Sequence, residues 1–193
     1  VIILTSYSIT TFILNSLLDA SGFGSSVTSI SEMYTEPLSG SLGGGIIDDH
    51  YPERNETEIP RNTRIMVTFN EAMDPSSFIS GYAEDATSTE LNVDSIIIYK
   101  TADGTETALE ATDVEVAMDE DFEIVVFDPV ELLGSTENDM NYTVVLTTNI
   151  EKADGTAAFS GYYSEGYEWT FEVSTEIDLT PPTVVSVIPE ESE

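Results

Sequence analysis

The sequence predicts an all-β fold: an antiparallel β-sandwich of about seven strands, preceded by an extended hydrophobic N-terminal segment. Two observations support this prediction. Val, Ile, Thr and Tyr are prominent among the 193 residues, whereas the helix-favouring Lys, Arg and Gln are nearly absent. From Ile46 onward, short runs of alternating apolar and polar residues are separated by turn signals, a pattern typical of antiparallel sandwiches.

The runs predict the first strands in chain order. A first strand is expected near Ile46 and Ile47. Residues 64–69 place Ile65, Val67 and Phe69 on one face of a second strand. Residues 95–100, SIIIYK, form a nearly continuous apolar run and are expected to be buried.

The later runs complete the sandwich. Residues 112–118 and 122–127 are expected to form a hairpin around the acidic turn at 119–121. Residues 141–148 and 168–173 supply the last two strands. Period-two alternation predicts the residues that face the core in these four strands: Val114, Val116 and Met118; Phe122, Ile124 and Val126; Tyr142, Val144 and Leu146; Trp169, Phe171 and Val173.

Composition divides the chain into four parts. Residues 1–19 form a hydrophobic segment whose first 18 residues carry no charge, and residues 20–45 form a Ser- and Gly-rich linker. The sandwich is expected over 46–177, and residues 178–193 are expected to add a strand and a tail. Polar residues interrupt residues 1–18 too often for a good membrane span, and both a strand followed by a helical turn and one hydrophobic helix fit the pattern.

The charge balance excludes several classes of partner. The chain has 37 acidic residues against 5 Lys and Arg, a formal net charge of -32. We expect no nucleic-acid partner and no lipid bilayer in the mature form, because both contacts depend on basic patches. Such a surface repels itself, so self-association requires salt, divalent cations or an acidic medium. With no cysteine, the chain has no disulfide and no thiolate site.

Several phrases resemble the bacterial Ig-like repeats that occur in tandem in large prokaryotic surface proteins. They are RIMVTFNEAMDPSSF, DPVELLGSTENDMNYTVVLTTNI, ADGTAAF, YEWTFEV and DLTPPTVVSVIP, and together they span roughly residues 46–190. The resemblance implies an Ig-like sandwich and an extracellular or cell-surface location. It also implies that PPTVVSVIP corresponds to the opening strand of a following repeat. Tyr142 follows a Leu-Gly turn and is expected to form a tyrosine corner, with its hydroxyl bonded to upstream backbone.

The sequence offers little chemistry, so we expect no enzyme activity. It contains no G-x-S-x-G elbow, P-loop or H-E-x-x-H motif. The single histidine, His50, stands beside two aspartates and is expected to be solvated on a strand edge. No cofactor is required on this interpretation.

Calcium is the one possible ligand that the composition suggests, because carboxylates are its usual ligands. Glu71, Asp74 and Asp178 form one candidate set, and the acidic turn at 119–121 forms another. A plain solvated acidic surface is the alternative. Lys100 and Lys152 are expected to make ordinary salt bridges rather than isopeptide bonds.

The uncharged N-terminal segment and the extra C-terminal strand favour a structural subunit of an extracellular filament, pilus or surface assembly. Copies would bind one another through heterologous contacts, as a homopolymer built by strand donation. A passive Ig-like spacer or adhesion module of a larger secreted protein is the alternative, and a carbohydrate-binding module is a third. The predicted subunit-interaction residues are Val1, Ile3, Tyr7, Ile9, Phe12, Ile13, Val184, Val185, Val187 and Ile188.

Overall fold

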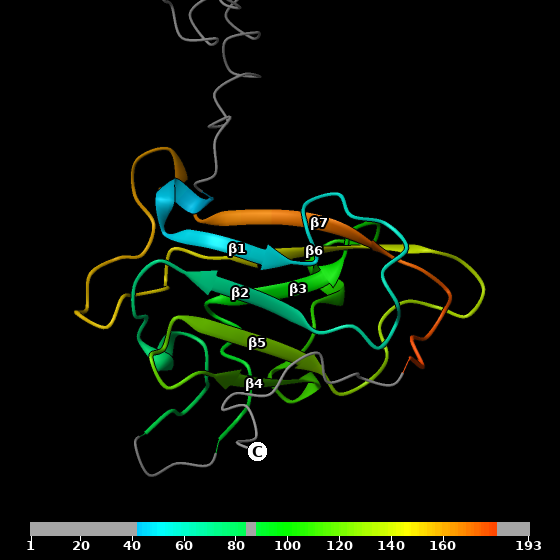
Figure 1. The fold of residues 1–193 in the computed structure, drawn as a ribbon, viewed down its shortest axis with the longest axis horizontal. Helices are drawn as coiled ribbons and strands as arrows, with labels where there is room; N and C mark the ends of the chain where they lie inside the picture. Colours follow the sequence, from blue (N-terminus) through cyan, green and yellow to red (C-terminus); the bar gives the residue numbers. More distant parts are fainter. Residues whose placement is uncertain (1–41, 84–87, 181–193) are drawn as a thin grey trace, which may run out of the picture. The chain divides into compact units, whose positions relative to one another are not determined.

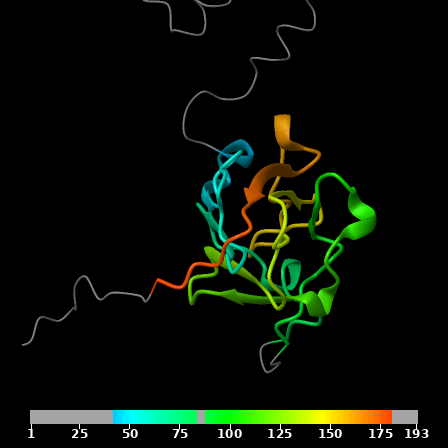
Figure 2. The same cartoon turned by 90° about the vertical axis from the view of Figure 1, so that its right-hand side faces the viewer.

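The computed structural model describes residues 42–83 and 88–180, which form two antiparallel sheets packed face to face (Figures 1 and 2). The four-stranded sheet has the order β1-β2-β5-β4 and the three-stranded sheet the order β3-β6-β7. The predicted seven-stranded all-β sandwich is therefore confirmed. The strands are β1 (Ile47–Tyr51), β2 (Ile65–Phe69), β3 (Ile96–Lys100), β4 (Val114–Met118), β5 (Ile124–Pro129), β6 (Met140–Leu146) and β7 (Tyr167–Val173).

Five single 3-10 turns lie in the connections, and the described residues contain no α-helix. They are η1 (Gly43–Gly45), η2 (Pro75–Ser77), η3 (Thr105–Thr107), η4 (Ala111–Asp113) and η5 (Gly161–Tyr163). Asp74 caps η2 through its carboxylate, which accepts from the Ser76 N–H at 2.9 Å, and Pro75 occupies the first turn.

Cross-strand registers place the predicted apolar sets of β2, β6 and β7 on the inner faces. Tyr142 pairs with Phe171 and Val144 with Trp169 between β6 and β7, while Ile65 pairs with Phe127 between β2 and β5. Alternate residues of β2, β5 and β7 are buried, as period two requires, while in β6 Thr143 is buried as well. The largest fully buried side chains are Trp169, Tyr167, Phe69, Phe78, Phe127 and Phe171.

The predicted inner face of β5 is wrong by one residue. Val125 and Phe127 are buried, whereas Phe122, Ile124 and Val126 are only partly buried. Phe122 lies in the connection between β4 and β5 and has a φ of 57°. In the same connection, the Asp119 carboxylate accepts hydrogen bonds from the N–H groups of Glu123 and Ile124. This turn shifts the register by one residue, and a shift of one exchanges the two faces of a strand.

The tyrosine corner is confirmed. The Tyr142 hydroxyl accepts a hydrogen bond from the Gly134 N–H at 2.9 Å, eight residues upstream. Gly134 has a φ of 71°, and a Cβ at this position would lie 2.9 Å from Val173 Cγ1. Both the backbone conformation and the close approach to β7 therefore require glycine here.

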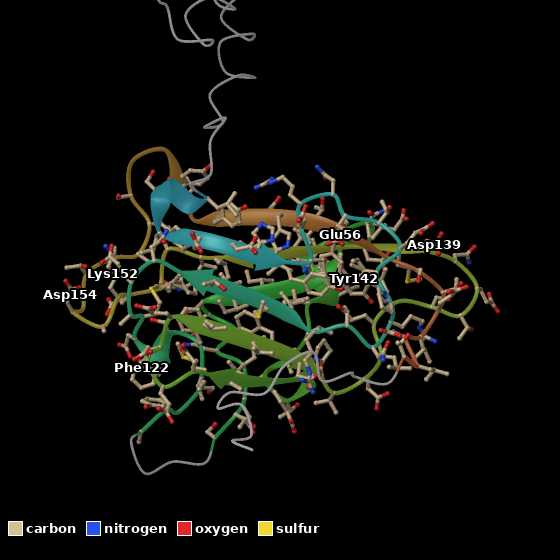
Figure 3. The ribbon with its side chains drawn as sticks, viewed as in Figure 1. Glu56, Phe122, Asp139, Tyr142, Lys152 and Asp154 are labelled. Atoms are coloured by element: carbon tan, nitrogen blue, oxygen red, sulfur yellow. The ribbon has the colours of Figure 1, made fainter. Side chains whose placement is uncertain are left out.

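The sandwich has two ends, which we call the entry end and the exit end. At the entry end, Leu42 bridges to Ile47 at the start of β1, and η1 packs against Phe159 and Tyr163, just before β7. β1 and β7 therefore start at the same end (Figure 1). At the exit end, residues 59–62 contact residues 173–178, beyond the end of β7. Figure 3 shows Lys152 and Asp154 at one end and Asp139 at the other.

Candidate assembly surface

The residues predicted to join subunits lie outside the described part of the chain. This is true of the N-terminal set, Val1 to Ile13, and of the C-terminal set, Val184 to Ile188. The structure instead describes the surface that such segments would meet. On a β-sandwich, the positions where another strand can add are the outer edges of its sheets.

The outer edge of β7 is covered by residues 54–59 of the same chain. The Asn55 N–H donates to the Thr170 carbonyl at 2.7 Å, and the Glu172 N–H donates to the Glu56 carbonyl at 2.8 Å. Arg54 donates from Nη2 to the Glu168 carbonyl at 2.8 Å. An added strand could not reach β7 without displacing these contacts.

The other three edge strands are also engaged. On β4, the Val116 N–H donates to the Thr89 carbonyl at 2.7 Å. On β3, the Ile98 carbonyl accepts from the Leu109 N–H at 2.8 Å. On β1, the His50 N–H donates to the Asp49 carboxylate at 2.8 Å, so an acidic side chain occupies that edge. Short covered edges and edge charges are the usual protection against unwanted pairing.

Beyond β7, residues 174–180 form what we call the exit segment. It runs parallel to residues 59–62, with the Ser174 N–H donating to the Ile59 carbonyl at 2.8 Å and the Arg61 N–H donating to the Glu176 carbonyl at 2.8 Å. Asn62 and Asp178 continue this ladder, because the Asn62 side chain accepts from the Asp178 N–H and donates to the Asp178 carbonyl. The body therefore fixes the course of the chain as far as Asp178.

The opposite side of the exit segment is open. Within the described part of the chain, the N–H groups of Ile177 and Leu179 make no hydrogen bond. Ile177 and Leu179 are 41% and 85% exposed, and both line a groove that also includes Glu58 and Pro60. Exposed apolar side chains beside unpaired backbone are the features of an edge that can accept a strand.

The three predicted calcium ligands do not form one site. Glu71 and Asp74 follow β2 at the entry end, while Asp178 lies beside Asn62, which precedes β2 at the exit end. Hydrogen bonds from Thr180 lower the pKa of the Asp178 carboxyl. Residues 42–83 and 88–180 contain no group of three or more side chains arranged to hold a metal ion.

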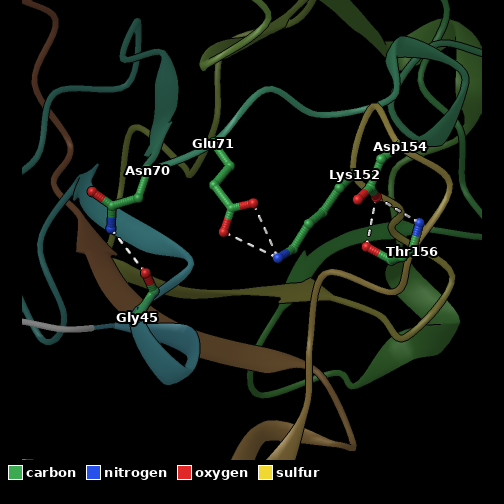
Figure 4. A network of polar contacts seen from close by, with 6 residues as sticks. All are labelled: Gly45, Asn70, Glu71, Lys152, Asp154 and Thr156. Carbon is green, nitrogen blue, oxygen red and sulfur yellow. Dashed lines mark hydrogen bonds and ion pairs between the residues drawn. The ribbon is translucent and has the colours of Figure 1, made fainter.

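Glu71 instead forms a salt bridge at the entry end that links the connection after β2 to the connection after β6 (Figure 4). The Lys152 ammonium donates to both of its carboxylate oxygens, at 3.0 and 3.2 Å, and Met73 forms a bridge with Lys152. Asp154 accepts from the N–H and hydroxyl of Thr156, and these hydrogen bonds lower the pKa of its carboxyl. Lys152 thus makes the expected salt bridge.

The expectation that His50 is solvated is wrong. His50 is 4% exposed, and its ring lies 4.2 Å, centroid to centroid, from Trp169. Nδ1 lies 2.8 Å from the Pro52 carbonyl and Nε2 lies 2.9 Å from the Tyr167 hydroxyl. Because β1 and β7 belong to different sheets, His50 fills the space between them instead of facing water.

The sequence signal for a carbohydrate-binding module is a set of scattered aromatic residues, which are Tyr162, Tyr163, Tyr167 and Trp169. Tyr167 and Trp169 are buried in β7, and the Trp169 Nε1–H donates to the Pro52 carbonyl at 3.1 Å. Arg54 covers the Tyr167 ring, with Cζ 5.3 Å from the ring centroid. These two side chains are therefore not available to stack on a sugar.

Similarity to solved structures is weak. The S-layer protein rSbsC is 19% identical, with a TM-score of 0.37, over 64% of this chain and 13% of that one. CopC from Methylosinus trichosporium OB3b is 12% identical over 70% of this chain and 98% of its own, with a TM-score of 0.40. PcoC, a copper resistance protein from Escherichia coli, is 14% identical over 66% of this chain and 98% of its own, with a TM-score of 0.42.

Two searches found nothing. The search of curated proteins gave no match. Among the described residues, no helix combines the length and the apolar character needed to cross a bilayer.

The model of the bacterial Ig-like domain matches residues 46–173, which include all seven strands. Domains of this family are structural or binding modules, typical of surface proteins. The chain belongs to the bacterial Ig-like domain family.

Proposed function

We propose that the chain is a structural subunit of an extracellular filament, pilus or surface assembly, and that copies join by donating an apolar terminal segment to a neighbour. The observation that carries the proposal is that the four edge strands are engaged by the chain's own residues. Contacts between subunits then fall to the terminal segments and to open backbone such as that of the exit segment.

The character of the described body supports a structural role. Its buried side-chain polar atoms all have hydrogen-bond partners among the described residues, and the single histidine is used in packing. A sandwich whose buried polar groups are all hydrogen-bonded is suited to be a structural building block. Its family is also one of structural and binding modules.

The arrangement of the ends favours open polymers. The chain enters the sandwich at Leu42 and leaves it at Thr180, at opposite ends. A contact between a segment at one end and an acceptor at the other is heterologous, and such contacts build fibres unless a ring closes. Because a formal charge of -32 opposes association, salt or divalent cations should promote it.

Deletion of residues 1–18 tests the proposal. Purified full-length chain is expected to form long assemblies in about 1 M NaCl, whereas the deletion variant stays monomeric. Sedimentation velocity and negative-stain electron microscopy report both states. Deleting an equally long piece of the linker, residues 22–39, is the control and should leave assembly intact.

A second deletion, of residues 181–193, shows whether the C-terminal strand takes part. If neither deletion changes the sedimentation of the protein, strand donation is wrong. The chain is then a passive Ig-like spacer or adhesion module of a larger surface protein.

A further inference from the structure

We propose that the open edge of the exit segment is the acceptor for the uncharged N-terminal segment, residues 1–18, of a second copy. This inference rests on the proposed function and deepens it, because it names the donor, the acceptor and the direction of assembly. Loss of this acceptor would leave strand donation through another edge intact.

The acceptor edge is already held in an extended course. Residues 59–62 pair with one side of the exit segment, and the two hydrogen bonds between Asn62 and Asp178, at 2.8 and 2.9 Å, fix its end. The N–H groups of Ile177 and Leu179 are without acceptors among the described residues. Because the segment is ordered before a partner arrives, adding a strand costs less conformational entropy than at a mobile loop.

Charge selects the occupant. Glu58, Glu176 and Asp178 surround the exposed side chains of Ile177 and Leu179, so an approaching acidic surface is repelled. Residues 1–18 carry no charge, whereas the tail after the exit segment contains Glu190, Glu191 and Glu193. The N-terminal segment can therefore bury its Ile, Val and Phe side chains at this edge without adding charges of its own to it.

Donation between copies would link opposite ends of the body. The N-terminal segment joins the body at the entry end, and the acceptor lies at the exit end, beyond the full length of β1 and β7. Donation to the next copy joins an exit end to an entry end and repeats without limit. The result is a head-to-tail filament.

Disulfide trapping tests the contact directly, because the chain has no cysteine of its own. One batch of full-length protein carries Leu179→Cys. A second, isotope-labelled batch carries Ile3→Cys, Ile9→Cys or Ile13→Cys, one at a time. The batches are mixed in about 1 M NaCl with oxidised glutathione, and mixed dimers are counted by intact mass. A disulfide forms only where the two Cα atoms approach within about 7 Å.

The matched control replaces Leu179→Cys by Val93→Cys. Val93 is 44% exposed and lies at the entry end, since its neighbour Asn92 donates to the Ser76 carbonyl. We expect at least one donor position to give about tenfold more mixed dimer with Leu179→Cys than with Val93→Cys, because donation raises the local thiol concentration. Equal yields at all three donor positions would overturn the acceptor assignment.

A variant without new thiols gives an independent readout. Ile177→Ser combined with Leu179→Ser should abolish assembly, while Val93→Ser should leave it unchanged. If the double variant assembles like the wild type, the acceptor lies elsewhere, although loss of assembly on deleting residues 1–18 would still support strand donation. If the wild type forms no assembly at all, both the proposed function and this inference are wrong.

Discussion

His50 joins the two sheets through both of its ring nitrogens. The Pro52 carbonyl can only accept, so Nδ1 carries the proton and donates to it at 2.8 Å. Nε2 then accepts from the Tyr167 hydroxyl at 2.9 Å. Burial is the main cause that lowers the pKa of His50 below 6.5, against the opposing effect of the Pro52 hydrogen bond. The neutral ring is therefore the form that the fold accommodates.

Replacing His50 tests this linkage. His50→Phe should lower the free energy of unfolding by about 1–3 kcal/mol at about pH 8, because it leaves buried polar groups without partners. As the pH falls below 6.5, the unfolded chain binds the proton first, so the wild type loses the stability that neutral His50 provides. The difference in the free energy of unfolding between wild type and variant should therefore be smaller at about pH 5 than at about pH 8. Urea unfolding at both pH values measures it, and a gap that widens would contradict the assignment.

The tyrosine corner gives a second residue-level prediction. Tyr142→Phe removes the acceptor of the Gly134 N–H and should cost about 1–3 kcal/mol in the free energy of unfolding, measured with urea. Tyr99→Phe, on the neighbouring strand β3, is the control, because the Tyr99 hydroxyl makes no hydrogen bond among the described residues. Equal losses for the two variants would show that the Tyr142 hydroxyl contributes nothing.

These two residues also show what sequence predicts at this scale. Tyr142 was predictable because its bond to Gly134 spans only eight residues and follows a recognisable turn. The role of His50 was not, because its partner Tyr167 is 117 residues away. A histidine between acidic neighbours gives no sign of which way its side chain points.

At the scale of the elements, the exit segment is held partly by backbone hydrogen bonds and partly by hydrogen bonds from a side chain. Its backbone bonds to Ile59 and Arg61 are followed by the reciprocal pair of Asn62 and Asp178. Side-chain amides can extend a strand pairing in this way because they offer a donor and an acceptor side by side.

Asn62→Ala should release this last part of the ladder. We expect amide exchange at Asp178, whose N–H donates to the Asn62 side chain, to accelerate about tenfold or more, while the melting temperature changes little, since the pair is exposed. Hydrogen exchange with mass spectrometry on peptides covering 174–180 measures the effect. Asn149→Ala, which removes a comparable exposed bond to the Asp94 carbonyl, should leave that peptide unchanged. Unaltered exchange in Asn62→Ala would show that backbone bonds alone hold the segment.

Strand positions were predictable because a strand that buries one face has apolar residues at alternate positions, as in β2, β6 and β7. The inner face of β5 was not, because the Asp119 turn absorbs one more residue than the alternation suggests. The exit segment also escaped prediction. Its pairing partner, residues 59–62, lies in a long connection with no strand pattern of its own.

At the level of the whole molecule, most of the scarce basic residues tie distant segments together. Arg54 and Arg61 donate to the carbonyls of Glu168 and Leu133, while Arg64 pairs with Asp128 and Lys152 with Glu71. Neutralising 37 acidic residues with 5 basic ones is impossible, so the remaining repulsion must be screened by the solvent.

The melting temperature should therefore rise with ionic strength. Going from about 0.05 M to about 1 M NaCl should raise it by several degrees, because screening favours the compact, self-repelling state. Calorimetry or thermal circular dichroism measures the shift, and a fall with salt would contradict the argument. Millimolar calcium at constant ionic strength separates screening from binding. A further rise that a chelator reverses supports a bound ion, while no rise rejects the calcium prediction for this domain.

The candidate assembly surface was only half predictable at this scale. Terminal segments that are uncharged or β-prone stand out by composition, so the proposed donor was visible in the sequence. The proposed acceptor was not, because an open edge is defined by which backbone groups stay unpaired after the sandwich closes. The bonds on the edges of β1, β3, β4 and β7, and the open N–H groups of Ile177 and Leu179, become visible only in the folded chain.

Entry and exit at opposite ends have a mechanical consequence. A pull on the two flanking segments acts along the length of β1 and β7, so the bonds between neighbouring strands are loaded in shear and must break together. Had both segments left from one end, the same pull would peel the strands apart one bond after another. A sandwich threaded in this way is suited to carry tension along the chain.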